Sequence, residues 1–110
     1  MLLHNASSDF FHWLQCADDP ALAFVVVDAA RLDVAYAPER LHRGLREAGI
    51  DCEEAPVLFV ICTIHPPPAE PTANLLAPLA VCPRCLRGAQ ILLPDAGYGS
   101  REPLFARIAA

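Results

Sequence analysis

The chain has 110 residues, of which 55% are hydrophobic, and its thirteen acidic and eight basic residues give a net charge of −5. A chain of this length forms one domain at most, and its apolar content excludes disorder. A nucleic-acid binder needs a basic face to displace counterions from phosphates, so the acid excess argues against DNA or RNA as a direct ligand. An acidic surface is instead suited to a basic protein partner, and the alternative is that the acid excess only keeps the protein soluble.

The apolar runs are too short for a membrane protein. The longest, "LAFVVV" and "VLFVIC", have six residues each, whereas a helix needs about 20 to cross a bilayer. The start, "MLLHNASSDFFHW", lacks the basic residues and sustained apolar stretch of an export signal. These features predict a cytoplasmic protein. Because the cytoplasm is reducing and the number of cysteines is odd, the cysteines are expected to be free thiols packed as small hydrophobic residues. The cysteines are Cys16, Cys52, Cys62, Cys82 and Cys85.

The first part of the chain predicts strands. Residues 9–16, "DFFHWLQC", are rich in aromatic side chains and predict a strand that runs into a turn at "ADDP". Residues 22–28, "LAFVVVD", are almost continuously apolar, which predicts a central strand covered on both faces. Residues 32–36, "LDVAY", alternate between apolar and other residues and predict a short strand.

The next segment, "APERLHRGLREAGI", predicts a helix over about residues 38–48. Pro38 suits a first helical position, and Gly49 is a natural C-terminal stop. The apolar face of this helix is expected to consist of Leu41, Leu45 and Ala48.

The second half predicts further strands. Residues 56–65, "PVLFVICTIH", are the strongest strand candidate, and the following "PPPAEP" must leave the sheet as a connector. Residues 72–82 return to an apolar pattern, and a turn at "CPRC" followed by a strand at residues 88–94 predicts a β-hairpin. Together these elements predict a single domain over residues 1–110 with a mainly β fold, in which about five to seven short strands accompany one α-helix.

The "CPRC" stretch at residues 82–85 has three interpretations. As a hairpin turn, it places Pro83 at a favoured second position. As half of a zinc site, it would require ligands such as Cys52, Cys62 or His65 to converge on it. As a redox couple, it would be expected at a helix N-terminus, whereas a strand follows here. The spacing favours the turn and leaves the other two open.

The sequence contains no recognisable catalytic motif. The four histidines lie in four different contexts, and none belongs to a nucleophile elbow or triad element. A glycine-rich phosphate loop is also missing. Asp18 and Asp19 precede a proline between two predicted strands, which is typical of a turn. The sequence therefore predicts no enzyme activity, no cofactor and no metal ion.

Three stretches in a consistent order resemble the FliW family of flagellar assembly factors: "FFHWLQCADDPALAFVVVD", then "TANLLAPLAV", then "YGSREPL". The resemblance runs from Phe10 to Leu104. It implies a mainly β fold, a small antiparallel barrel-like domain, and a cytoplasmic, non-enzymatic regulator. This regulator is expected to bind flagellin and the RNA-binding translational repressor CsrA, and to antagonise the binding of CsrA to flagellin messenger RNA. Accumulated flagellin would occupy the regulator, and the freed repressor would stop flagellin translation.

For such a regulator, partner contacts are expected from exposed acidic loops and from "TANLL", where an asparagine amide can hydrogen-bond an extended backbone. The alternative for the two leucines of "TANLL" is plain core packing. The expected contact residues are Asp18, Asp19, Glu53, Glu54, Thr72, Asn74 and Leu75.

Two departures from the family pattern affect these expectations. Members usually carry a further N-terminal segment with a "GLPGF"-like motif, and its absence would leave open sheet edges that favour self-association. Where relatives carry a turn like "NTKTRKG", this chain has "CPRCLRG", which agrees with a hairpin. The alternatives are a zinc or redox sensor built on Cys82 and Cys85, or a degenerate paralogue without partners.

Overall fold

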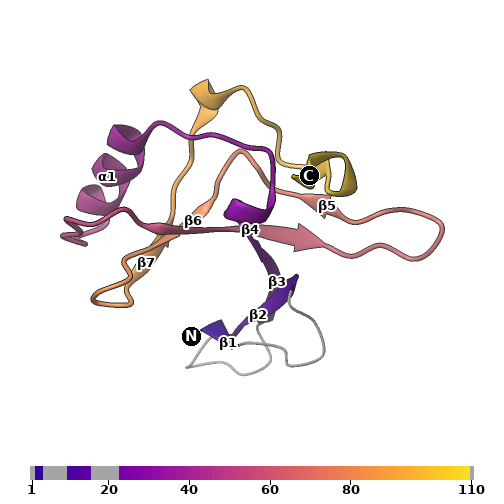
Figure 1. Cartoon of the computed structure of the whole chain (residues 1–110), viewed down its shortest axis with the longest axis horizontal. Helices are drawn as coiled ribbons and strands as arrows, with labels where there is room; N and C mark the ends of the chain where they lie inside the picture. The colour runs from indigo at the N-terminus through magenta and orange to yellow at the C-terminus, as the bar shows by residue number, and fades with distance from the viewer. Residues whose placement is uncertain (1, 4–9, 16–22, 110) are drawn as a thin grey trace.

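The computed structural model describes residues 2–3, 10–15 and 23–109, which form an antiparallel β-sheet accompanied by one α-helix (Figure 1). The predicted mainly β class is confirmed. The strands are β1 (Leu2–Leu3), β2 (Phe11–Gln15), β3 (Ala23–Asp28), β4 (Val57–Thr63), β5 (Thr72–Ala73), β6 (Leu79–Val81), β7 (Gly88–Gln90) and β8 (Glu102–Pro103). The helices are α1 (Pro38–Glu47) and the 3-10 turns η1 (Ala29–Arg31), η2 (Pro94–Ala96) and η3 (Phe105–Arg107).

Strand β4 is the central strand of the sheet, and the sheet forks along one of its edges, where β5 and β6 pair with different parts of β4. One of its edges pairs with β3, from Phe59 opposite Asp28 to Cys62 opposite Val25. The other edge is divided, because the start of β4 pairs with β6 and its last two residues pair with β5. Figure 1 shows β6 and β7 on one side of this fork and β5 on the other. No pairing between described strands closes the sheet, so the fold is barrel-like only in a loose sense.

The prediction of a central strand at β3 is confirmed. Val26 and Val27 are neighbours in the chain and point to opposite faces, yet both are 0% exposed. A strand that buries consecutive residues must be covered on both sides, which is why its sequence is continuously apolar and does not alternate.

Two hydrophobic clusters form the core. The first lies around β3, β4 and β5 and includes Val27, Val60, Cys62, Leu75 and Leu104. The second lies between α1 and the β6–β7 hairpin and includes Leu41, Leu45, Cys52, Cys82 and Ile91. Leu58 packs against both clusters, so the start of β4 is where they meet.

Helix α1 begins and ends as its sequence predicts. Pro38 occupies its first turn, and Gly49 ends it in the left-handed conformation, with φ of 80°. The predicted apolar face is correct for the two leucines but wrong for Ala48, which is exposed. Its expected place in the core is taken by Ile50, because the chain reverses at Gly49 and returns towards the sheet.

Two predicted strands differ from the structure. Residues 32–36 do not form a strand, because only Leu32 is paired, through a single bridge to Ile108, and the rest is an extended connector. An alternating pattern cannot reveal that a ladder partner is missing. The strand predicted over residues 88–94 ends at Gln90; Ile91 still donates to the Pro78 carbonyl at 2.8 Å, but a proline has no N–H with which to continue the ladder.

Candidate partner-binding surface

A shallow apolar groove of about 430 Å³ lies where the two core clusters meet. Its walls come from η1 and the connector after it on one side, and from the start of β4 on the other. The side chains that line it are mostly small or aliphatic, so the groove offers hydrophobic contact and few polar anchors. The lining residues are Asp28, Ala29, Ala30, Val34, Tyr36, Pro56, Val57 and Leu58.

The local sequence explains how η1 forms one wall. Asp28 ends β3, and its carboxylate accepts a hydrogen bond from the Ala30 N–H at 2.9 Å. This capping contact turns the chain away from the sheet immediately after the strand. Ala29 is buried in the first cluster, whereas Ala30 is exposed and faces the groove opening. A small residue at position 30 therefore keeps the groove accessible.

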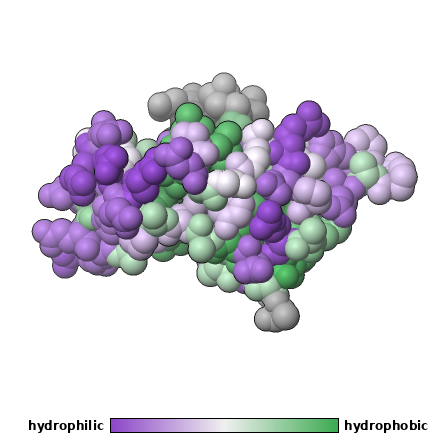
Figure 2. Space-filling model, turned by 90° about the horizontal axis from the view of Figure 1, so that it is seen from above, coloured by the Kyte–Doolittle hydropathy of each residue, from purple (hydrophilic) through white to green (hydrophobic). Residues whose placement is uncertain are grey.

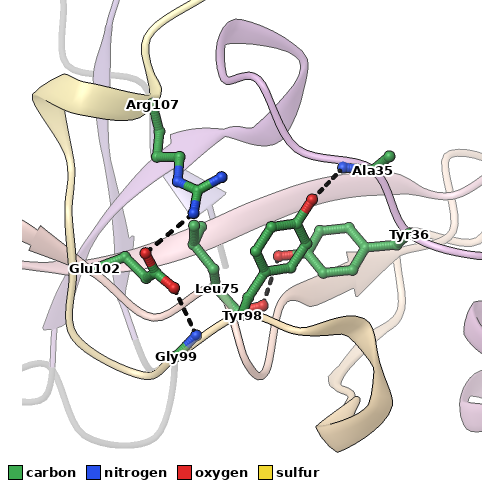
Figure 3. A network of polar contacts seen from close by, with 7 residues as sticks. All are labelled: Ala35, Tyr36, Leu75, Tyr98, Gly99, Glu102 and Arg107. Carbon is green, nitrogen blue, oxygen red and sulfur yellow. Dashed lines mark hydrogen bonds and ion pairs between the residues drawn. The ribbon is translucent and has the colours of Figure 1, made fainter.

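Tyr36 is the aromatic residue that lines the groove, and two contacts outside the groove lining hold its side chain in place. Its hydroxyl donates a hydrogen bond to the Leu75 carbonyl at 2.6 Å, and its ring meets the Tyr98 ring edge to face with centroids 5.5 Å apart. The Tyr98 hydroxyl in turn accepts the Ala35 N–H at 3.0 Å (Figure 3). Three segments that are distant in the sequence are thus held together behind one groove wall.

A carboxylate supports the far side of this network. Glu102 accepts hydrogen bonds from the Gly99 N–H at 2.7 Å and from the Arg107 guanidinium at 3.2 Å (Figure 3). Both contacts, the Gly99 N–H first, hold the pKa of the Glu102 carboxyl below its usual value. Arg107 also lies over the Tyr98 ring, 5.2 Å from its centroid. The closing loop at residues 97–101 is therefore fixed against η3.

We expect Tyr36→Phe to lower the free energy of unfolding by about 1–2 kcal/mol, because the Leu75 carbonyl loses its donor. Partial burial raises the pKa of Tyr36 from 10.0 to about 12. Between these pH values the folded protein keeps a proton that the unfolded chain has lost, so stability falls as the pH rises. Urea unfolding at about pH 9 and about pH 11 should show a smaller alkaline loss in Tyr36→Phe than in the wild type.

Tyr98→Phe is the matched control for this prediction. The Tyr98 hydroxyl accepts one N–H, from an exposed backbone position. In Tyr98→Phe water can accept that N–H instead, so the loss of unfolding free energy should be smaller than in Tyr36→Phe. An equal alkaline loss of stability in the wild type and in Tyr36→Phe would contradict the role given to the Tyr36 hydroxyl.

The predicted acidic contact residues are only partly placed. Glu53 and Glu54 are exposed in the loop between α1 and β4. Glu54 pairs loosely with Arg84 of the β6–β7 turn, at 3.6 Å between exposed side chains, which adds little stability. Asp18 and Asp19 lie outside the described residues.

The "TANLL" residues turn out to shape the fold from within. The Thr72 hydroxyl lies 3.1 Å from Nε2 of His65. The Asn74 side-chain oxygen accepts the Ala77 N–H at 3.2 Å, so it already binds its own turn. Leu75 is 0% exposed in the first cluster, which is the core alternative that the sequence left open. What this segment supplies to the groove is the Leu75 carbonyl that holds Tyr36.

The sequence alone did not single out the groove residues. Tyr36 was expected only as part of a short strand, and "YGSREPL" contributed to a resemblance without a physical role. The chain has just two tyrosines. A tyrosine packs its ring against apolar groups while its hydroxyl needs a hydrogen-bond partner, so these two residues were the available signal for a special position. Their contact joins positions 62 residues apart, which local patterns do not show.

Hydrophilic residues gather towards both ends of the face shown in Figure 2. Figure 2 shows a mainly hydrophilic end, which in Figure 1 carries α1 and the β6–β7 turn, and green hydrophobic patches across the middle. Within the described ranges, no helix is long and apolar enough to cross a membrane. No set of three potential ligand side chains in that part of the chain is arranged to hold a metal ion.

Comparison with known proteins gives the family. The family model described as FliW protein matches residues 1–104. The chain belongs to the FliW family. This confirms the resemblance found in the sequence.

Individual relatives agree with this FliW membership. The "Flagellar assembly factor FliW" of Syntrophus aciditrophicus is 36% identical over 100 residues, which cover 91% of this chain and 63% of the relative. The protein of the same name from Symbiobacterium thermophilum is 31% identical over 99 residues, covering 90% and 72%. A crystal structure of the flagellar assembly factor FliW superposes with a TM-score of 0.70 at 26% identity, covering 93% of this chain and 71% of that one.

This FliW-family chain is shorter than several of its relatives. It spans 63%, 58% and 62% of the length of the FliW proteins from Syntrophus aciditrophicus, Geotalea uraniireducens and Geobacter sulfurreducens.

Proposed function

We propose that this chain is a cytoplasmic, non-enzymatic flagellar assembly regulator that binds flagellin and antagonises a CsrA-type translational repressor, so that the flagellin level controls flagellin translation. Family membership carries this proposal, since residues 1–104 match the FliW model. The relatives are named flagellar assembly factors, and a regulator of this kind acts by binding two protein partners in turn.

The groove is the site proposed for flagellin. An apolar groove with few polar groups suits the apolar face of an amphipathic segment. Such a segment is recognised through side chains at helical or extended spacing. The groove is bounded by fixed elements, because η1 is capped by Asp28 and Tyr36 is held by the Leu75 carbonyl. A preformed groove binds with little loss of conformational entropy.

The acidic loop is the site proposed for the repressor. Asp51, Glu53 and Glu54 are exposed within four residues of chain between α1 and β4. An RNA-binding repressor needs a basic surface for phosphates, and the same surface is attracted to a cluster of carboxylates. Because the contact is electrostatic, its association rate should fall as salt rises.

The proposal is tested by titrating the purified full chain with monomeric flagellin and, separately, with the CsrA-type repressor. Both should bind, and the chain should release the repressor from a flagellin messenger RNA leader. Flagellin added afterwards should restore repressor binding to the RNA. If the chain binds neither protein under conditions where both are folded, the proposal fails.

We expect the double substitution Glu53→Gln and Glu54→Gln to weaken repressor binding about tenfold at low salt, because two interacting charges are removed. Flagellin binding should be unchanged. Glu70→Gln is the matched control, since Glu70 is an exposed carboxylate in the loop between β4 and β5, which Figure 1 places at the opposite end of the fork. Equal weakening by the control would show a general charge effect and contradict a site at the acidic loop.

A further inference from the structure

Three cysteines from two loops lie together beside the acidic loop. Cys82 and Cys85 belong to the turn between β6 and β7, and Cys52 comes from the segment that follows α1. Cys52 and Cys82 belong to the same buried cluster, Cys82 and Cys85 line the same cavity, and both neighbours are near enough to influence the ionisation of the Cys82 thiol. Sequence spacing pairs only Cys82 with Cys85, and the fold adds the third thiol.

The turn is shaped to stabilise a negative charge on Cys82. It is closed by two backbone hydrogen bonds of 2.8 Å, from the Leu86 N–H to the Cys82 carbonyl and from the Cys82 N–H to the Arg87 carbonyl. Leu86 adopts the left-handed conformation, with φ of 61°. This arrangement brings the N–H groups of Arg84 and Cys85 to the Cys82 sulfur, as in a backbone nest for an anion.

The donors around Cys82 have opposite effects on the two inner thiols. The Cys52 thiol first, and then the N–H groups of Cys85 and Arg84, lower the pKa of Cys82 from 9.0 to about 7. The neighbouring Cys82 thiol and burial raise the pKa of Cys52 to about 11, and the Cys52 thiol donates a hydrogen bond to the Glu54 carbonyl at 3.2 Å. Of these two thiols, Cys82 is the one that ionises near neutral pH, and Cys52 stays protonated.

A small cavity gives access to this cluster. It has a volume of about 220 Å³ and is lined by Asp51, Glu53, Glu54, Arg84, Cys82 and Cys85. Cys82 is 3% exposed and lines this cavity, whereas Cys85 is exposed at the tip of the turn. The three carboxylates disfavour anionic reagents, and a small neutral oxidant can enter.

We propose that Cys82 and Cys85 form a hydroperoxide-responsive dithiol, in which Cys82 is oxidised first and Cys85 closes a reversible disulfide. This inference concerns a modification site, and its chemistry does not depend on whether the chain binds flagellin or a repressor. Cys52 is a positioning residue that stabilises the ionised Cys82.

The oxidation proceeds in two balanced steps. The Cys82 thiolate attacks one oxygen of a hydroperoxide, the O–O bond breaks, and the departing alkoxide takes a proton to leave as an alcohol. Cys82 is now a sulfenic acid. The Cys85 sulfur then attacks the Cys82 sulfur, an S–S bond forms, and the hydroxide leaves as water with the Cys85 proton. Two thiols lose two electrons together, and one hydroperoxide is reduced.

Cys62 is an internal control for this proposal. It is buried in the first cluster, donates to the Val60 carbonyl at 3.7 Å, and has its pKa raised to about 11 by burial. A thiol of this kind is expected to be unreactive. An oxidant that attacks protein thiols without selectivity would also oxidise Cys62. Oxidation of Cys82 and Cys85 while Cys62 stays reduced therefore distinguishes the proposed site from a general effect.

The test uses the full chain with Cys16→Ser, since Cys16 lies outside the described residues. Treatment with hydrogen peroxide should remove two thiols, and peptide mapping should find a Cys82–Cys85 disulfide that a dithiol reductant reverses. In Cys85→Ser, whose changed side chain is exposed, a sulfenic-acid reagent such as dimedone should label Cys82. Alkylation by iodoacetamide at neutral pH should be at least about tenfold faster at Cys82 than at Cys62.

Separate outcomes would overturn the proposal. One is a Cys82 that remains reduced while Cys52 or Cys62 is oxidised. Another is equal alkylation of Cys82 and Cys62 across the pH range from about 6 to about 9. A third is zinc at one equivalent in the purified chain together with protection of Cys82 and Cys85 from alkylation, which would make the cluster a metal site. Cys52→Ser should slow the oxidation of Cys82 without preventing the disulfide, and an unchanged rate would refute its positioning role.

Discussion

Ala30→Arg is expected to weaken flagellin binding at least about tenfold, a loss of about 1.4 kcal/mol. Ala30 is exposed at the rim of the groove, so a long side chain there extends over the space proposed for the flagellin segment. The backbone contact that shapes η1, from the Ala30 N–H to Asp28, does not involve the side chain. Calorimetric titration with monomeric flagellin measures the change in affinity.

Two further variants separate occlusion of the groove from a charge effect. Ala48→Arg adds the same side chain at an exposed position at the end of α1, and it should leave flagellin affinity unchanged. Ala30→Glu blocks the groove with the opposite charge and should weaken binding as Ala30→Arg does. If only one of the two Ala30 variants weakens binding, the groove is not the flagellin site proposed here.

The second large effect is expected from Gly44→Ala, which should destabilise the fold although alanine is the better helix former. A Cβ at Gly44 would lie 2.6 Å from Cγ2 of Ile91 and 3.0 Å from Cδ1. Overpacking of this kind costs about 1–3 kcal/mol, whereas the intrinsic gain of alanine over glycine in a helix is at most about 1 kcal/mol. Urea unfolding should therefore show a net loss of stability.

The sign of this effect should reverse when the obstacle is removed. In an Ile91→Ala background, which is itself less stable, Gly44→Ala meets no branched side chain and should add stability through its helix propensity. The same substitution is thus expected to destabilise one background and stabilise the other. A stabilising effect in the wild-type background would show that α1 does not pack on the β6–β7 hairpin at the observed distance.

The elements that the sequence predicted are those whose signal is local. The continuous apolar runs predicted β3 and β4, the Pro38 and Gly49 pair bounded α1, and the "CPRC" turn located the β6–β7 hairpin. In each case the residues that specify the element lie within it. The helix face was wrong at Ala48 because the position of the sheet, which selects Ile50, is not encoded within the helix itself.

The candidate sites depended on long-range contacts and were less predictable. Nothing in "LDVAY" shows that its tyrosine meets Tyr98 and a carbonyl of "TANLL". The approach of Cys52 to Cys82 likewise depends on how α1 docks on the hairpin. The side-chain oxygen of the "TANLL" asparagine accepts a hydrogen bond within its own turn, which the sequence does not reveal, and the contact of this asparagine with a partner stays a prediction.

The divided edge of β4 has a consequence for motion. Strand β3 is joined to β2 by five residue pairs and to β4 by four. On the other edge of β4, only three residue pairs join it to β6 and only two join it to β5. Local opening takes least free energy where a strand has few ladder contacts. Strands β5 and β6 can therefore each separate from β4 transiently while the pairing of β2, β3 and β4 stays intact, so opening at this edge does not require the whole molecule to unfold.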